Sequence, residues 1–143
     1  MTQEERELLL KDLCGRIPYG MKVHFGSEPW TLTGLFKSGY AGVMVILLPR
    51  FPAANAYPNT SNWPLEKVKP YLRPLSSMTD EEKEELVSKH IKLVFEDKNH
   101  NPETVAVDID GFEWLNAHHF DFRGLLKKGL AIEVTPENNP YKL

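Results

Sequence analysis

The sequence has little that would support cross-linking, secretion or membrane insertion. It contains one cysteine, Cys14, so no disulfide can form within the chain, and the pattern around this residue predicts a buried structural thiol. The first residues, MTQEERELLLKDL, are charged and lack the basic start and apolar run of a secretory signal. The longest apolar run, AGVMVILLP at 41–49, is too short to span a bilayer. These absences predict a cytoplasmic protein with no membrane partner.

Familiar catalytic and nucleotide-binding signatures are also missing. The chain has no G-x-S-x-G nucleophile turn, no P-loop and no G-x-G-x-x-G, and no pattern in it predicts a cofactor. The formal net charge of -3 opposes non-specific nucleic-acid binding, which needs a positive field. The sequence therefore favours a non-enzymatic protein with an unknown protein partner, and it leaves the oligomeric state open.

What is present is a chain of 143 residues, the length of one compact domain. Thr2 and Glu5 form a Thr-x-x-Glu capping box, which predicts a helix over about 3–14 that ends at Gly15. Three alternating or β-branched segments follow, MKVHF, WTLTGLF and VMVILL, and tight turns separate them. They predict a small, mostly antiparallel sheet or partial barrel.

The middle of the chain is rich in proline. Residues 49–64 predict an irregular loop, because Pro, Asn, Ala and Ser dominate them. Pro70 and Pro74 disfavour a central strand, so short extended pieces at a sheet edge are expected around them.

The rest of the chain alternates short helices and strands. Thr79 and Glu82 form a second capping box for a helix over 80–96, although IKLVF at 91–95 also alternates as a strand does. The segment TVAVDI predicts an extended piece. Further N-caps are expected at two aspartates, Asp110 for a helix reaching about His118 and Asp121 for the helix FRGLLKK, which Gly129 ends. LAIEV predicts a last strand, and a loose tail is expected from about 135. The fold class is α+β, with the short helices toward the C-terminus.

Two motifs, KPYLRPLSSMT at 69–79 and WLNAHHFDFRGLLKKGLA at 114–131, carry a resemblance. With the first helix, they resemble a family of short uncharacterised proteins from gut bacteria and their phages or mobile elements. The resemblance covers the first 20 residues, 69–86 and 112–134. It implies a bacterial or phage context, and it brings no activity, cofactor or catalytic residue.

The densest group of reactive side chains is His118, His119 and Asp121, with Glu113 and Arg123 nearby. Imidazole and carboxylate suit a zinc or iron site, and a metal-assisted hydrolase with Glu113 as base is one hypothesis. Adjacent histidines on a helix point about 100° apart, however, so both rarely bind one ion. The favoured interpretation is a structural joint in which one ring packs between helices, Asp121 caps a helix and Arg123 pairs with a carboxylate.

Two surfaces are candidates for binding. Aromatic residues of the 51–64 segment, Phe51, Tyr57 and Trp63, predict an apolar patch for a protein partner, the first hypothesis. A nucleic-acid surface is the alternative, since aromatic and basic side chains together can stack bases and neutralise phosphates. Its candidate residues are Lys67, Lys69, Tyr71 and Arg73.

Overall fold

The computed structural model describes residues 1–26, 28–39, 42–49, 61–89, 91–96, 102–107 and 109–141, and the side chains of these residues except 87–89, 91–96 and 102–107. Its helices are α1 (Gln3–Arg16), α2 (Asp80–Lys89) and α3 (Ile109–Ala117), with the 3-10 turns η1 (Ile17–Tyr19), η2 (Leu65–Lys67) and η3 (Leu75–Ser77). Its strands are β1 (Lys22–Phe25), β2 (Glu28–Ser38), β3 (Gly42–Pro49), β4 (Ser61–Pro64), β5 (Lys69–Pro74), β6 (Ile91–Glu96), β7 (Pro102–Val107), β8 (Phe120–Asp121) and β9 (Ile132–Glu133).

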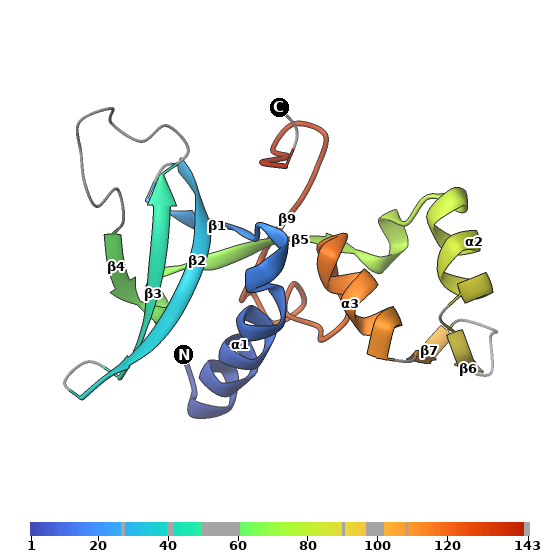
Figure 1. Ribbon diagram of the computed structural model, residues 1–143, viewed down its shortest axis with the longest axis horizontal. Coiled ribbons are helices and arrows are strands. Elements are labelled where there is room, and N and C mark those ends of the chain that lie inside the picture. Colours follow the sequence, from blue (N-terminus) through green and yellow to red (C-terminus); the bar gives the residue numbers. More distant parts are fainter. Residues whose placement is uncertain are drawn as a thin grey trace.

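One mixed sheet organises these elements. Its strand order is β4-β3-β2-β1-β5-β8, with β9 also paired to β5, and β6 and β7 form a separate hairpin. All pairs are antiparallel except those that β5 makes with β8 and β9. Figure 1 shows β1–β4 at one end of the molecule, α1 in the middle, and α2 and α3 at the other end. The predicted α+β class and the mostly antiparallel sheet are confirmed; the sheet is not closed into a barrel.

The larger core lies between α1 and one face of the sheet. Leu9 and Leu13, one helical turn apart, are fully buried against strand residues such as Val45 and Leu47. Each buried Leu or Val side chain contributes about 1.5–3 kcal/mol relative to leaving it in water. A smaller cluster joins α2, α3 and β8, and it is built from Leu86, Trp114, Leu115 and Phe120.

The first helix starts as predicted but ends later. The Thr2 hydroxyl accepts a hydrogen bond of 3.1 Å from the Glu5 amide, as the capping box requires. Gly15 does not end the helix. A Cβ at this position would lie 3.2 Å from Nδ2 of Asn116, so the glycine lets α3 approach α1 closely. The positive φ of 68° that stops the segment belongs to Gly20, after η1. Cys14, predicted to be buried, is exposed.

Strand β5 lies inside the sheet rather than at its edge, which corrects the expectation drawn from its prolines. Pro70 pairs with Val23 of β1, Tyr71 and Leu72 pair with β9, and the last two residues pair with β8. Each of these ladders spans only two residue pairs, so the strand changes partners along its length. A proline has no backbone N–H to donate, and such short ladders need few hydrogen-bond donors from β5.

Three further predictions are corrected. The helix expected over 80–96 ends at Lys89, and the competing strand is the one that forms, as β6. The loop expected over 49–64 contains β4 at its end, while 50–60 lie outside the described residues. Asp110 lies inside the first turn of α3 rather than at its cap, because α3 begins at Ile109. No helix in the described ranges is long and apolar enough to cross a bilayer.

Candidate functional site

The segment that follows α3, which we call the joint, is held by side-chain contacts to its own backbone and to α1. The carboxylate of Asp121 accepts three backbone hydrogen bonds of 3.0 Å, from the amides of Gly124, Leu125 and Leu126. It caps a series of turns rather than the predicted helix. These turns end in a Schellman motif at Gly129, where the Leu130 amide donates to the Leu125 carbonyl. Both oxygens of Asp121 are therefore engaged by the backbone.

A buried ion-pair network holds this segment against α1. Asp12 and Arg16 are both fully buried, and the Arg16 guanidinium donates to the two carboxylate oxygens of Asp12 at 2.8 and 2.9 Å. Arg16 also donates to the Phe120 carbonyl at 2.6 Å, and Arg123 donates to Asp12 at 2.8 Å. One buried carboxylate thus faces two guanidinium groups, and the network carries a surplus positive charge. Arg123 was expected to pair with a carboxylate, and the carboxylate is that of Asp12, near the other end of the chain.

The two adjacent histidines have different environments. Nδ1 of His118 donates to the Trp114 carbonyl at 2.8 Å, and its ring stacks on the Trp114 indole with centroids 3.9 Å apart. His119 lies beyond the helix, with a positive φ of 65°, and its ring stacks on Tyr141 at 3.7 Å. Burial is the main cause that lowers the pKa of His119 from 6.5 to about 4, and the charge of Arg16 acts in the same direction. His119 is therefore a neutral packing residue near pH 7.

The C-terminal segment is anchored through Tyr141, where the sequence predicts a loose tail. The Tyr141 hydroxyl donates to the Tyr71 carbonyl at 2.8 Å and accepts from the Lys22 amide at 3.2 Å. It bridges β1 and β5 close to where their two-pair ladder stops. Burial raises the pKa of this hydroxyl, so it stays protonated. Composition alone could not reveal this contact, because the groups that bond to Tyr141 belong to two strands that are distant from it in the sequence.

The arrangement does not assemble the metal centre that the alternative hydrolase hypothesis requires. In the described part of the chain, no group of three or more His, Cys, Asp or Glu side chains could hold an ion. Glu113, the suggested base, is exposed on α3. Side-chain atoms of His118 and Asp121 that could bind an ion instead form hydrogen bonds with backbone groups.

The predicted nucleic-acid surface is divided by the fold. Lys67 and Lys69 are exposed, but Tyr71 is buried and its hydroxyl lies 3.1 Å from Nδ1 of His24. Arg73 makes a bidentate pair with Glu82 at 2.7 and 2.8 Å, and this pair lowers the pKa of Glu82 to about 2. The same carboxylate completes the second capping box, accepting from the Thr79 amide at 3.0 Å. Two of the four predicted residues are thus occupied within the protein.

Of the three predicted partner-binding aromatics, only Trp63 is described. It is 39% exposed on β4 and contacts Phe25, with ring centroids 4.4 Å apart. Its backbone partner is Val45, a core residue, so it projects from the side of the sheet that faces the core. Phe51 and Tyr57 lie outside the described residues.

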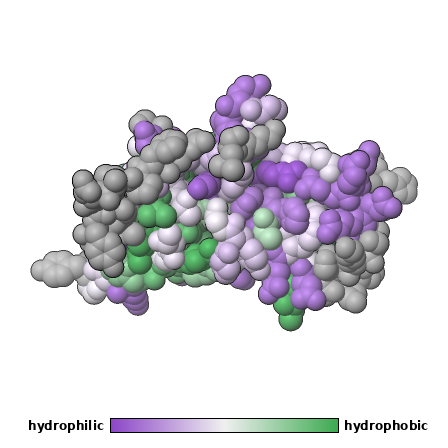
Figure 2. All heavy atoms as spheres, turned by 45° about the horizontal axis from the view of Figure 1, so that its top comes forward, coloured by the Kyte–Doolittle hydropathy of each residue, from purple (hydrophilic) through white to green (hydrophobic). Residues whose placement is uncertain are grey.

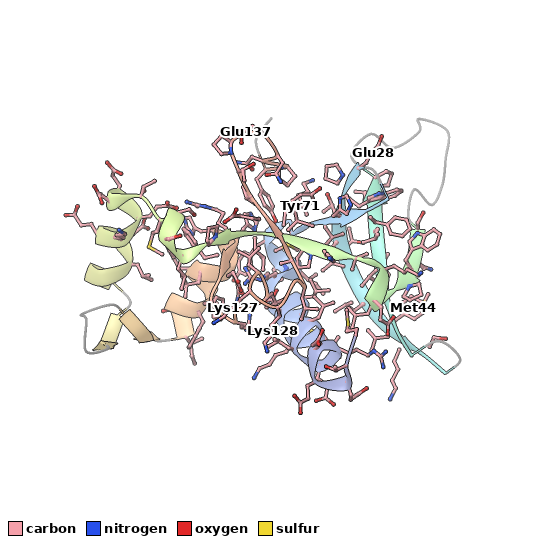
Figure 3. All side chains as sticks on the ribbon, turned by 180° about the vertical axis from the view of Figure 1, so that it is seen from behind. Glu28, Met44, Tyr71, Lys127, Lys128 and Glu137 are labelled. Carbon is pink, nitrogen blue, oxygen red and sulfur yellow. The ribbon has the colours of Figure 1, made fainter. Side chains whose placement is uncertain are left out.

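An apolar surface that the sequence reasoning missed lies on the other side of this sheet. Val45 and Leu47 of β3 point into the core, so the alternating Met44, Ile46 and Leu48 share the opposite face. Phe36 of β2 pairs with Met44 and is 41% exposed, while the three β3 residues are half-buried. We call these four residues the outer sheet face. Hydrophobic residues gather over the strand end of the molecule in Figure 2, and Figure 3 places Met44 at that end.

Two features build the outer sheet face. Register in β2 shifts between Leu32 and Gly34, so Phe36 falls on the opposite face from Leu32. Gly34 leaves room for Ile46, whose Cδ1 would lie 3.2 Å from a Cβ at that position. The signal in the sequence was the run VMVILL, which is apolar on both faces, whereas α1 packs against one face of the sheet in the described part of the chain.

No protein-family model, curated protein or solved structure matches this chain.

Proposed function

We propose that this protein is a non-enzymatic protein-binding domain that holds its partner against the outer sheet face. The observation that carries the proposal is the set of four apolar side chains, Phe36, Met44, Ile46 and Leu48, on the side of the sheet opposite α1. Contiguous exposed apolar surface is typical of protein interfaces. An accessory role in a bacterial or phage system is part of this proposal, and it rests on the resemblance of two sequence motifs.

The outer sheet face is a better candidate for binding a partner than the joint, because paired strands hold it in place. The outer sheet face stands on paired strands whose other side is the larger core, so its side chains are held in a fixed pattern. The joint residues Asp12, Arg16 and Asp121 instead satisfy one another or the backbone and are buried. A preorganised apolar surface binds a partner at a smaller entropic cost than a mobile one.

Site-specific photocrosslinking in cells of the native host tests the proposal. A photoreactive phenylalanine analogue at Phe36 is compared with the same analogue at Phe112, which is matched in exposure, 42% against 41%, and lies on α3. We expect a covalent product with one other protein from position 36 only, and we expect Ile46→Asp to abolish it. Equal products from both positions, or none from position 36, would contradict the proposal.

A further inference from the structure

The segment after β9 is a loop with few ties to the rest of the protein. We call residues 135–140 the C-terminal loop; in the described part of the chain its hydrogen bonds all stay within 133–141. The Asn138 side chain closes it, with hydrogen bonds of 2.6 and 3.0 Å to two backbone groups earlier in this segment. Figure 1 shows the loop projecting from the molecule, and Figure 3 places Glu137 on it. Segments with so few contacts open locally more readily than core strands do.

The loop is followed by Tyr141, whose side chain lies between three groups from distant parts of the chain. Its ring lies flat on the His119 ring, with centroids 3.7 Å apart and 9° between the planes. Its hydroxyl donates to the Tyr71 carbonyl at 2.8 Å and accepts from the Lys22 amide at 3.2 Å. We call these three groups the tyrosine slot. Strands of the main sheet carry the carbonyl and the amide, so the slot is built from supported parts.

The tyrosine slot suits a phenol better than an aromatic ring in general. A phenol hydroxyl meets one acceptor and one donor there, whereas a phenylalanine ring would deprive both backbone groups of this partner. A site built to bond a hydroxyl strongly rejects the analogue that lacks it. A tyrosine on another polypeptide presents the same atoms as Tyr141, and the packing of Tyr141 already demonstrates the fit.

We infer that the tyrosine slot is a binding site for a tyrosine side chain of another polypeptide, and that Tyr141 occupies it until the C-terminal loop opens. This site is separate from the outer sheet face. A tethered group competes with a free ligand at an effective concentration on the order of millimolar. The closed loop therefore lowers the affinity of the intact protein for the incoming side chain, and any change that loosens the loop raises it.

Hydrogen exchange in the wild-type protein tests whether the loop opens on its own. The Lys22 amide, which donates to the Tyr141 hydroxyl, is compared with the Leu32 amide, which donates to the Met21 carbonyl at 2.8 Å. We expect low urea concentrations to leave the exchange of the Lys22 amide unchanged and to accelerate that of the Leu32 amide. The same urea dependence for both amides would mean that only global unfolding uncovers the slot, and it would overturn the inference.

Binding is measured on the full chain carrying Tyr141→Ala, which removes the internal competitor. The probes are N-acetyltyrosinamide, N-acetylphenylalaninamide and p-cresol, followed through the NMR signals of the Lys22 amide and the His119 ring. We expect the tyrosine probe and p-cresol to bind with a Kd on the order of 1 mM. The phenylalanine probe should bind roughly tenfold more weakly or worse, and so should the tyrosine probe to the wild type.

A second variant keeps the test decisive if Tyr141→Ala does not fold. Asn138→Ala retains Tyr141 but removes the exposed side chain that closes the loop, so it should strengthen binding of the tyrosine probe over the wild type. Glu137→Ala, at the exposed tip, is the matched control and should bind like the wild type. Unchanged affinity in Asn138→Ala, or equal affinity of Tyr141→Ala for the tyrosine and phenylalanine probes, would overturn the inference. Binding of p-cresol alone would assign the slot to free phenols and overturn it as well.

Discussion

Removing the carboxylate of Asp12 should destabilise the protein more than the loss of its hydrogen bonds alone suggests. Asp12 is fully buried, and its two oxygens accept from Arg16 at 2.8 and 2.9 Å and from Arg123 at 2.8 Å. The change Asp12→Ala leaves the Arg16 charge buried, with the Phe120 carbonyl as its remaining acceptor among these contacts. Breaking a buried pair in this way costs about 3–5 kcal/mol. That is a large part of the roughly 5–15 kcal/mol that stabilises a typical domain.

Urea unfolding at pH 7, extrapolated to water, measures this loss, and an unchanged slope would show that the unfolded states are comparable. The matched control is Asp12→Ala combined with Arg16→Met, which removes both buried charges while keeping apolar volume. Because replacing a buried pair by apolar residues is often close to neutral, the double variant should be more stable than Asp12→Ala. Arg123 is partly exposed and can turn to water. A double variant no more stable than Asp12→Ala, or a loss below about 1 kcal/mol in the single variant, would refute the reasoning.

Three further predictions concern the joint. First, the pKa of His119 is lowered to about 4 in the native state. Between about pH 6.5 and 4 the unfolded state therefore takes up a proton that the native state does not. As the pH falls across this window, the free energy of unfolding should decrease by roughly 3 kcal/mol. His119→Asn, which tolerates the positive φ, should remove that part of the pH dependence. Second, Tyr141→Phe leaves the Tyr71 carbonyl without this donor and should cost about 1–3 kcal/mol in urea unfolding. Third, native mass spectrometry of protein purified without chelator should give the mass of the bare polypeptide, because Asp121 is fully engaged by backbone amides.

Each of these predictions has a clear opposing result. The same pH dependence in His119→Asn as in the wild type would assign the titration to other groups. Tyr141→Phe with wild-type stability would mean that the hydrogen bonds of the Tyr141 hydroxyl contribute nothing to the fold. Mass added by one or more transition-metal ions would restore His118 and His119 as candidate ligands.

Some local signals in the sequence predicted the local structure correctly. The two capping boxes at Thr2 and Thr79 both form, because a cap depends on residues only three positions apart. Alternation of apolar residues located β1 and β2, and a β-branched apolar run located β3. Asp121 was recognised as a cap, although it caps turns rather than the expected helix. In each case the residues that decide the structure are neighbours along the chain.

Contacts between distant segments were not predictable from those patterns. Arg123 was expected to pair with a carboxylate, but nothing near it in sequence identifies Asp12, which lies 111 residues away. The prolines of β5 indicated an edge, because the pattern does not show that three short ladders share this strand. The outer sheet face was missed for a similar reason: an apolar run predicts burial on both sides, and only the fold shows which side α1 covers.

The accessibility of β3 methyl groups tests the central claim most directly. Methyl NMR spectra are recorded with and without a soluble paramagnetic chelate, which broadens signals near the surface. The account predicts strong broadening for Met44 and Ile46 and little for Val45 and Leu47, their fully buried neighbours on the same strand. Equal protection of all four residues would mean that the outer sheet face is covered within the protein itself, and it would contradict a docking role for that surface.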